Sequence, residues 1–192
     1  FTRYQKTVTG LLAFLQFAVI LDFMLMSPLG AVIMPAMQIT PQQFGLVVSA
    51  YAFSAGASGL FTAGFADRFD RKRLLLFFYG GFVLGTVWCG LAQSFESLLL
   101  ARIVTGLFGG VIGSITLAIA TDLFAPHLRG RVMGIIQTSF AASQVLGIPI
   151  GLYLSNTWNW HVPFLAMAAL GGLYALVLIP VVRAGTQVST RF

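Results

Sequence analysis

The sequence predicts an all-α membrane protein with six transmembrane helices, and three observations lead to this fold class. Of the 192 residues, 58% are hydrophobic and only 8% are charged, whereas about 25% of the residues of an ordinary soluble domain are charged. The chain contains six apolar runs, each about as long as the roughly 20 residues that a helix needs to cross the ~30 Å hydrocarbon core. The basic residues are concentrated between these runs.

The apolar runs define the expected helices and divide the chain into three parts. A helix suits them because it satisfies its own backbone hydrogen bonds, which hydrocarbon cannot do. We expect a cytoplasmic N-terminal tail at residues 1–9, a six-helix transmembrane bundle at residues 10–183 and a cytoplasmic C-terminal tail at residues 184–192. The six runs cover residues 10–37, 42–65, 74–94, 97–124, 130–155 and 161–182.

The connections between the first three helices carry boundary signals. Thr40 and Pro41 follow the first run. Thr40 is a favourable N-cap and Pro41 fits the first turn of a helix, so the second helix begins at this point. Residues 67–73 form the most charged segment of the chain and separate the second helix from the third.

The last three helices each contain a distinguishing feature. The fourth carries Arg102, and the fifth contains Gly147, Pro149 and Gly151. Because proline removes a backbone donor and glycine permits close approach of a neighbouring helix, we predict a bend in the fifth helix. The sixth helix follows the aromatic segment at residues 158–164, Trp-Asn-Trp-His-Val-Pro-Phe.

The basic residues predict the orientation of the chain, because cytoplasmic loops retain lysine and arginine. Of the 11 lysine and arginine residues, all except Arg102 fall on the side of the membrane that holds both termini. We therefore place both termini in the cytoplasm. The residues on that side are Arg3, Lys6, Arg68, Arg71, Lys72, Arg73, Arg129, Arg131, Arg183 and Arg191.

Composition also argues against several other kinds of protein. The net charge of +6 could point to nucleic-acid binding, but the basic residues lie in short connections and are explained by topology. Cys89 is the single cysteine and lies inside an apolar run, so one chain offers neither a disulfide framework nor zinc-ligand spacing. We expect no metal and no cofactor.

Asp22 and Arg102 are the ionisable residues whose positions point to chemistry. Asp22 follows Gly10 by about 12 residues, which places it roughly 18 Å along its helix, near the midplane. A charge at the helix centre costs at least ~2.5 kcal/mol and usually faces a cavity or a partner. Arg102 cannot readily lose its proton and therefore requires an anionic or strongly polar neighbour.

We expect Asp22 and Arg102 to form a proton-coupling pair. Arg102 lies only about five residues inside the outer end of its helix, so direct contact requires a favourable tilt, and otherwise a water bridges the two. Two blander interpretations remain. Asp22 could be a permanently paired carboxylate that only fixes helix packing, and Arg102 could extend to the outer interface.

Four segments carry a resemblance to a known family. Residues 63–73 read Ala-Gly-Phe-Ala-Asp-Arg-Phe-Asp-Arg-Lys-Arg, and Arg102 is followed four residues later by Gly106. Together with the segments at residues 147–151 and 158–164, they resemble motifs of the major facilitator superfamily, in the same order and in the corresponding helices. These motifs are the G-x-L-A-D-R-x-G-R-R/K loop, R-x-x-Q-G in the fourth helix, the antiporter motif G-P-x-x-G-G in the fifth, and W-x-W-x-x-F.

The resemblance extends over essentially the whole chain but over only half of a usual family member. It implies an N-terminal half built as a 3+3 inverted repeat, of the drug and sugar efflux branch of proton antiporters. Ala63 and Asp70 stand where the loop motif has glycines, and Thr105 stands where the fourth-helix motif has glutamine. The small and hydroxyl residues shared by the second and fifth helices are explained more simply by close packing.

The matching loop residues imply a cytoplasmic gate. Asp67, Arg68, Arg71 and Lys72 match the motif, and Asp122, near the inner end of the fourth helix, is a candidate partner for Arg68 or Arg71. Such a network can hold helix ends together and break when the bundle rocks. The alternative is that these are solvated charges that serve only orientation, since exposed pairs contribute ~0 to 1 kcal/mol.

Substrate contacts can only be proposed as candidates. Gln137 and Gln144 are seven residues apart and therefore share one face of the fifth helix. Gln16 in the first helix and Tyr51 in the second could join them. We expect the substrate to be small, and amphipathic molecules or sugars fit the implied branch.

The expected function is proton-coupled efflux by alternating access in a bacterial inner membrane, with protons, a small-molecule substrate and membrane lipid as partners. One six-helix unit cannot enclose a transport path. A second unit is therefore needed, either a missing C-terminal half or a second parallel copy of this chain. The alternative is a non-transporting scaffold or regulatory half-transporter.

An enzyme is not expected. Gly56-Ala57-Ser58-Gly59 reads as the G-x-S-G of an intramembrane serine protease, with His161 as the base. Ser58 lies toward the cytoplasmic end of the second helix, whereas His161 lies at the outer edge of the sixth. That separation prevents the hydrogen bond that a nucleophile and its base require.

Overall fold

The computed structural model describes residues 1–189, with side chains described as far as residue 180, and every regular element in that part of the chain is a helix. Six helical segments are long and apolar enough to cross a membrane, which confirms the predicted all-α membrane class. The elements are α1 (Arg3–Met37), α2 (Pro41–Ala63), η1 (Ala66–Arg68), α3 (Arg71–Leu91), α4 (Phe95–Leu123), α5 (Pro126–Ala142), η2 (Ser143–Gly147), α6 (Ile148–Thr157) and α7 (His161–Ser189).

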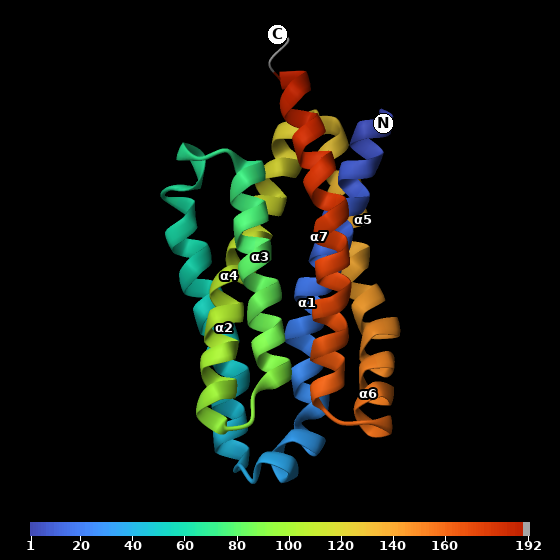
Figure 1. Ribbon diagram of the computed structural model, residues 1–192. Helices are drawn as coiled ribbons and strands as arrows, with labels where there is room; N and C mark the ends of the chain where they lie inside the picture. Colours follow the sequence, from blue (N-terminus) through green and yellow to red (C-terminus); the bar gives the residue numbers. More distant parts are fainter. Residues whose placement is uncertain (190–192) are drawn as a thin grey trace.

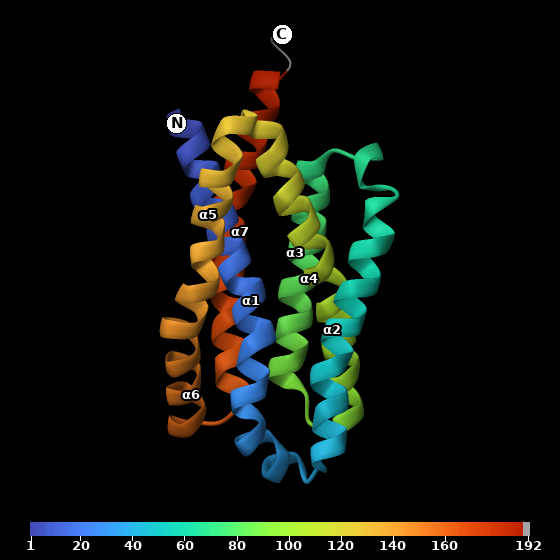
Figure 2. The same cartoon turned by 180° about the vertical axis from the view of Figure 1, so that it is seen from behind.

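The helices form an elongated bundle with the N-terminus and the end of α7 at the same end (Figure 1). This end is called the termini end below. Two groups of helices are visible from both sides, α2, α3 and α4 on one side and α1, α5, α6 and α7 on the other (Figure 2). Within the groups, α4 packs on α2 and α3, and α1 packs on α5 and α6, while α3 and α7 join the groups.

Part of this packing corresponds to the pattern expected of a 3+3 arrangement. Exchanging the first three spans with the last three turns the contact of α4 with α2 into the contact of α1 with α5. The correspondence is incomplete, because α3 packs extensively on α4 whereas α7 touches α1 only slightly. Spans one and four, which carry Asp22 and Arg102, are thus equivalent elements of the two groups.

The first and last helices extend beyond the predicted bundle of residues 10–183. Helix α1 begins at Arg3 rather than near residue 10 because Thr2 and Gln5 form a capping box that winds the expected tail into the helix. Helix α7 continues to Ser189, beyond the predicted end of the bundle at residue 183. Residues 190–192 of the predicted C-terminal tail, Arg191 included, lie outside the described residues.

The connections at the two ends of α2 follow from short-range hydrogen bonds. Thr40 caps α2 as predicted, since its hydroxyl accepts from the Gln43 backbone N–H at 3.2 Å. At the other end, the Asp70 carboxylate accepts from the Lys72 N–H at 3.1 Å and begins α3. Asp70 therefore replaces the glycine of the loop motif with a helix cap.

The fifth span is interrupted by an irregular turn at the segment where a bend is predicted. It consists of α5, the π-helical turn η2 and α6. Pro149 has no N–H to offer the carbonyl of Val145, which lies inside η2, so the regular α-helical pattern cannot continue through this point. The proline thus accounts for the irregular turn.

Large apolar side chains cover much of the outer surface of the bundle. Phe53, Leu60, Phe61, Leu84 and Val145 are among the exposed ones. A water-soluble monomer rarely exposes a continuous apolar surface of this extent. The exposure fits a chain surrounded by lipid or by a second bundle.

Candidate functional site

The two charged residues predicted inside the membrane meet at the junction of the two helix groups. Arg102 Nη1 donates to Asp22 Oδ2 at 3.0 Å and to the Asp22 carbonyl at 3.4 Å. The Asp22 side chain is 1% exposed, and the Arg102 side chain is 0% exposed. The contact is direct, so the bridging water considered from the sequence is not needed for the two residues to meet.

Tyr51 completes the cluster from α2. The Arg102 guanidinium carbon lies 4.5 Å from the centroid of the Tyr51 ring, and Phe23 stacks on that ring at 5.2 Å. A buried cation over an aromatic face gains ~0.5 to 2 kcal/mol. Tyr51, for which the sequence predicts a substrate contact, therefore packs on the arginine.

Small residues on α4 make this arrangement possible. A Cβ added to Gly106 would lie 2.6 Å from the Tyr51 carbonyl oxygen and would also strike the Ser54 hydroxyl. A Cβ on Gly110, one turn further, would lie 2.6 Å from the Ser58 hydroxyl oxygen. Close approach of α2 and α4 through small residues is the usual packing mode inside membranes. It brings Tyr51 onto Arg102.

The bent fifth span supports the helix that carries Asp22. A Cβ on Gly147 would come within 2.5 Å of Leu21 Cδ1, and a Cβ on Gly151 would come within 2.5 Å of Leu25 Cδ1. These two leucines flank Asp22 on α1. The glycines of the predicted bend therefore also fix the position of the Asp22 segment.

The cluster retains unused hydrogen-bonding capacity. Within the described part of the chain, Asp22 Oδ1, Arg102 Nε and Nη2, and the Tyr51 hydroxyl are buried without a hydrogen-bond partner. Buried polar atoms of this kind are costly unless water or a ligand satisfies them. These atoms can form hydrogen bonds to a polar ligand, and Asp22 Oδ1 can take up a proton, while Arg102 Nη1 stays in contact with Asp22 Oδ2.

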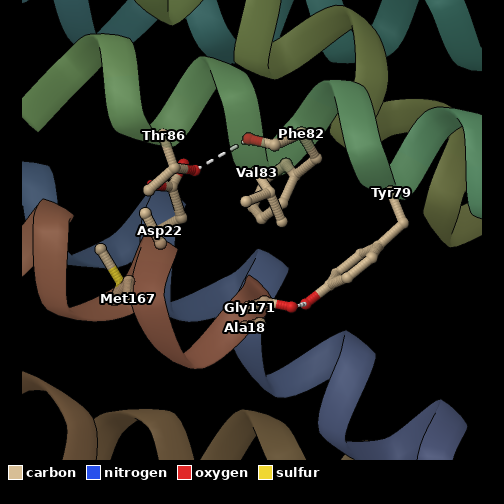
Figure 3. A pocket seen from close by; sticks show the side chains of 9 residues that line it. Ala18, Asp22, Tyr79, Phe82, Val83, Thr86, Met167 and Gly171 are labelled. Atoms are coloured by element: carbon tan, nitrogen blue, oxygen red, sulfur yellow. Dashed lines mark hydrogen bonds between the residues drawn. The ribbon is translucent and has the colours of Figure 1, made fainter. Parts of the chain in front are cut away.

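A small cavity adjoins the carboxylate between α1, α3 and α7 (Figure 3). Figure 3 shows the Asp22 side chain beside Thr86, with Tyr79 toward the other end of the same space. The Tyr79 hydroxyl donates to the Gly171 carbonyl at 2.9 Å and closes that end. The cavity is lined by Ala18, Asp22, Tyr79, Phe82, Val83, Thr86, Met167, Ala168 and Gly171.

Sequence reasoning missed Thr86 and Tyr79. A signal was present, because the two residues are seven apart in α3 and so lie on one helix face. Hydroxyl groups in apolar helices are common, however, and nothing in the spacing shows that this face meets the Asp22 helix. The cavity depends on the packing of α3 against α7, which only the fold supplies.

The glutamine candidates are not gathered around the ion pair by hydrogen bonds. Gln16 is partly buried, and its Oε1 has no partner among the described residues. Gln137 is exposed on α5, whereas Gln144 is partly buried in η2. The π-helical turn changes the register assumed when both were placed on one face. Their part in substrate binding stays a prediction.

A second charged cluster lies at the termini end. Arg71 Nη2 contacts Asp67 Oδ1 at 3.1 Å, and Arg71 Nη1 contacts Asp122 Oδ2 at 2.6 Å. Of the two partners considered for Asp122, the structure selects Arg71. Within the described residues, Arg68 and Lys72 form no ion pair. Arg71 thus links the loop after α2 to the end of α4.

Comparison with known proteins gives a consistent result. The family model described as Major Facilitator Superfamily matches residues 12–191. The Uncharacterized MFS-type transporter YceJ of Bacillus subtilis (strain 168) is 31% identical over 83% of this chain and 41% of its own length. Multidrug resistance protein 3 of the same organism is 31% identical over 71% of this chain and 27% of its own length. A Probable sugar efflux transporter of Helicobacter pylori (strain ATCC 700392 / 26695) is 26% identical over 76% of this chain and 39% of its own length.

Solved structures show the same fold. A bacterial homologue of the human lysosomal transporter Spinster, inward-facing and occupied, superimposes with a TM-score of 0.80 at 22% identity. The match covers 94% of this chain and 45% of that structure. The peptide transporter POT in complex with sulfate gives a TM-score of 0.77 at 15% identity, over 93% of this chain and 37% of that one. The chain thus spans less than half the length of these proteins.

Proposed function

Because the chain belongs to the Major Facilitator Superfamily, we propose that it is one half of a proton-coupled transporter that exports small amphipathic molecules or sugars. The observation that carries the proposal is the buried ion pair of Asp22 and Arg102, with a 3.0 Å contact between α1 and α4, which belong to different helix groups. Its position near the middle of α1 is where secondary transporters concentrate their substrate and ion sites.

The proposed coupling follows from what protonation does to this pair. When Asp22 is ionised, Arg102 has its counter-charge and the two helix groups are held together at this point. When Asp22 takes up a proton, the electrostatic part of that contact is lost and the preference between two arrangements of the bundle changes. Proton binding and substrate binding then favour different arrangements, which is the requirement for exchange transport.

The class of substrate rests on the relatives. Multidrug resistance protein 3 and the Probable sugar efflux transporter are named for resistance and for export. We propose Gln16, Tyr51, Gln137 and Gln144 as substrate contacts. The free Tyr51 hydroxyl would link a bound polar group to the Arg102 site on which its ring packs.

The proposed gate is the Arg71 cluster at the termini end, formed with Asp67 and Asp122. It connects the loop after α2 to the end of α4, so rocking of the bundle would alter it. Arg68 and Lys72 would take new partners when the second half closes on this end. The pairs are partly exposed, which suits contacts that must break during transport.

The remaining proposals concern assembly and location. The transport path would require a second six-helix unit, either a C-terminal half or a parallel second copy, whose contact surface would include the exposed apolar faces of α2 and α5. We place the protein in a bacterial inner membrane with both termini in the cytoplasm. The support is the basic residues at the termini end.

The mass of the particle in lipid nanodiscs, corrected for lipid, distinguishes the two forms of assembly. Two copies of the chain support the parallel dimer, whereas one copy directs the search to a separate second half. Coexpression of the chain with candidate second halves, followed by copurification, identifies that half. The transport assay then uses whichever assembly is found.

The test of function uses this assembly reconstituted in proteoliposomes with an imposed pH gradient. Ethidium and a radiolabelled hexose serve as probes of the two substrate classes, and an enclosed pH dye records proton movement. We expect one class to accumulate with the gradient and to stimulate proton flux. A scaffold or regulatory half would give neither signal, which would contradict the proposal.

A further inference from the structure

We propose that the cavity between α1, α3 and α7 is a water-binding site through which the Asp22 carboxyl exchanges its proton. The inference rests on the proposed function in one respect, since it takes Asp22 as the group that carries the proton. It adds two features: a bound water as the ligand, and the side of α1 from which the proton reaches Asp22. Neither follows from the ion pair itself.

The first support is the position of the free carboxylate oxygen. Asp22 Oδ2 is engaged by Arg102, and Oδ1 is buried without a partner among the described residues. Asp22 is only 1% exposed, so bulk water does not reach this oxygen directly. The cavity is a space that Asp22 itself lines.

The second support is the size of the cavity. Its volume is about 10 Å³, which is close to the lower limit of about 10–15 Å³ for one water molecule. A substrate molecule is far too large for it. The cavity therefore fits a single water and is distinct from any space that binds the exported compound.

The third support is the supply of hydrogen-bond acceptors. Thr86 donates its proton to the Phe82 carbonyl at 3.0 Å, and Tyr79 donates to the Gly171 carbonyl at 2.9 Å. Both hydroxyl oxygens keep lone pairs that can accept. A water in the cavity can donate one hydrogen to Asp22 Oδ1 and the other to the neighbouring Thr86 hydroxyl (Figure 3), which gives it the two partners that a buried water needs.

The proton step balances without a further reactant. A hydronium that reaches the site transfers one proton to Oδ1 and leaves a neutral water. Release returns the proton from the carboxyl group to that water. The titratable or charged groups near Asp22 are Arg102 on α4, Tyr51 on α2 and Cys89 on α3. Tyr79 lines the other end of the cavity (Figure 3), and α7 presents Met167, Ala168 and Gly171 to it.

Two adjacent glycines on α7 provide a matched test. A Cβ added to Gly171 would lie 3.0 Å from Val83 Cγ2 and 3.1 Å from the Tyr79 hydroxyl oxygen, inside the cavity lining. A Cβ added to Gly172 meets no atom within 4 Å. Gly171→Ala thus places one methyl group in the small cavity, at its Tyr79 end, and removes most of the space for a water, while Gly172→Ala makes the same chemical change outside the cavity.

The experiment uses infrared difference spectroscopy on the whole chain in lipid nanodiscs. The bound water is identified as an O–H stretching band that shifts in H₂¹⁸O and is altered by Asp22→Asn. We expect this band in the wild type and in Gly172→Ala, and its loss in Gly171→Ala. Thr86→Val, which removes one acceptor at nearly constant volume, should shift the band. Absence of the band in the wild type, or equal loss in both alanine variants, would overturn the water site.

The proton-exchange part has its own readout. The protonated Asp22 band is assigned by its loss in Asp22→Asn, and its shift on transfer to D₂O gives the exchange rate. We expect Gly171→Ala to slow this exchange at least tenfold and Gly172→Ala to leave it within twofold. Equal rates in the wild type and Gly171→Ala, or failure to detect a protonated Asp22, would refute the route. These infrared measurements do not depend on transport, so they can be interpreted even if the transport assay is negative.

Discussion

The molecule contains two arginine–aspartate clusters with similar bonding distances and very different surroundings. Arg102 Nη1 lies 3.0 Å from Asp22 Oδ2, and the two side chains are 0% and 1% exposed. Arg71 contacts Asp122 at 2.6 Å, with side chains 29% and 60% exposed. Distance alone would rank the second contact as the stronger. The cost of removing one partner gives the opposite ranking. Loss of one member of a buried pair leaves a charge that water cannot reach.

The two clusters also differ in how the surrounding side chains and water hold them. The buried cluster is enclosed by the packing of Tyr51 and of the glycines of α4. The surface cluster can open and close at small cost because water replaces each lost contact. In the proposed mechanism the buried pair would carry the proton and the surface cluster would form the gate.

The largest expected effect comes from Arg102→Leu, which breaks the buried pair and leaves Asp22 without a partner. We expect it to lower the free energy of unfolding by about 3–5 kcal/mol. The measurement is SDS-induced unfolding in mixed micelles. The double variant Asp22→Asn/Arg102→Leu should recover part of the loss, and a single-variant effect below ~1 kcal/mol would show that the two clusters are energetically alike.

Gly106→Ala should have the next largest effect, because its methyl group would enter the space of the Tyr51 carbonyl and the Ser54 hydroxyl. Overpacking of this kind costs about 1–3 kcal/mol. Gly113→Ala is the control on the same helix, since its Cβ meets no atom within 4 Å. Equal unfolding midpoints for the two variants would contradict the close approach of α2 and α4 as the basis of the buried cluster.

Tyr51 sharpens the comparison by separating its ring from its hydroxyl. Tyr51→Leu removes the aromatic face over Arg102 and should cost about 0.5–2 kcal/mol of unfolding free energy. Tyr51→Phe keeps the face and removes a hydroxyl that has no partner among the described residues, so its effect should stay within ~0.5 kcal/mol. A larger loss of unfolding free energy in Tyr51→Phe than in Tyr51→Leu would show that the hydroxyl, and not the ring, provides the stabilisation.

The smallest expected effect belongs to the surface cluster. Arg71→Gln should change the unfolding free energy by only ~0 to 1 kcal/mol. The difference from the wild type should shrink further in high salt, because partly exposed charges are screened. Arg68→Gln is the matched control, since Arg68 lies in the same connection and forms no ion pair in the described chain. A salt-independent loss above ~2 kcal/mol for Arg71→Gln would end the distinction between the clusters.

The sequence was sufficient to predict the fold and the charged partners. Hydropathy and loop charge define six spans in this chain, and Asp22 and Arg102 stand out because ionisable residues are rare inside spans. The family motifs predicted the same superfamily that the match to the family model shows for this chain. The helical start at Arg3 was missed because hydropathy marks where a helix enters lipid, not where it begins winding.

The rest of the site depends on contacts between helices that periodicity does not reveal. Tyr51 was selected as a polar residue in an apolar helix, but its position over Arg102 depends on how closely α2 approaches α4. Gly147 was selected for a bend, while its contact with Leu21 beside Asp22 requires the packing of η2 on α1. The Thr86 cavity requires three helices at once.

The central claim is that Asp22 carries the coupled proton, and Asp22→Asn in the reconstituted transporter tests it most directly. Asparagine keeps the shape and a carbonyl acceptor for Arg102 but cannot take up or release a proton. We predict that this variant retains substrate exchange across the membrane without a gradient and loses accumulation driven by a pH gradient. Full gradient-driven accumulation by Asp22→Asn, at the wild-type ratio of protons to substrate, would contradict the account.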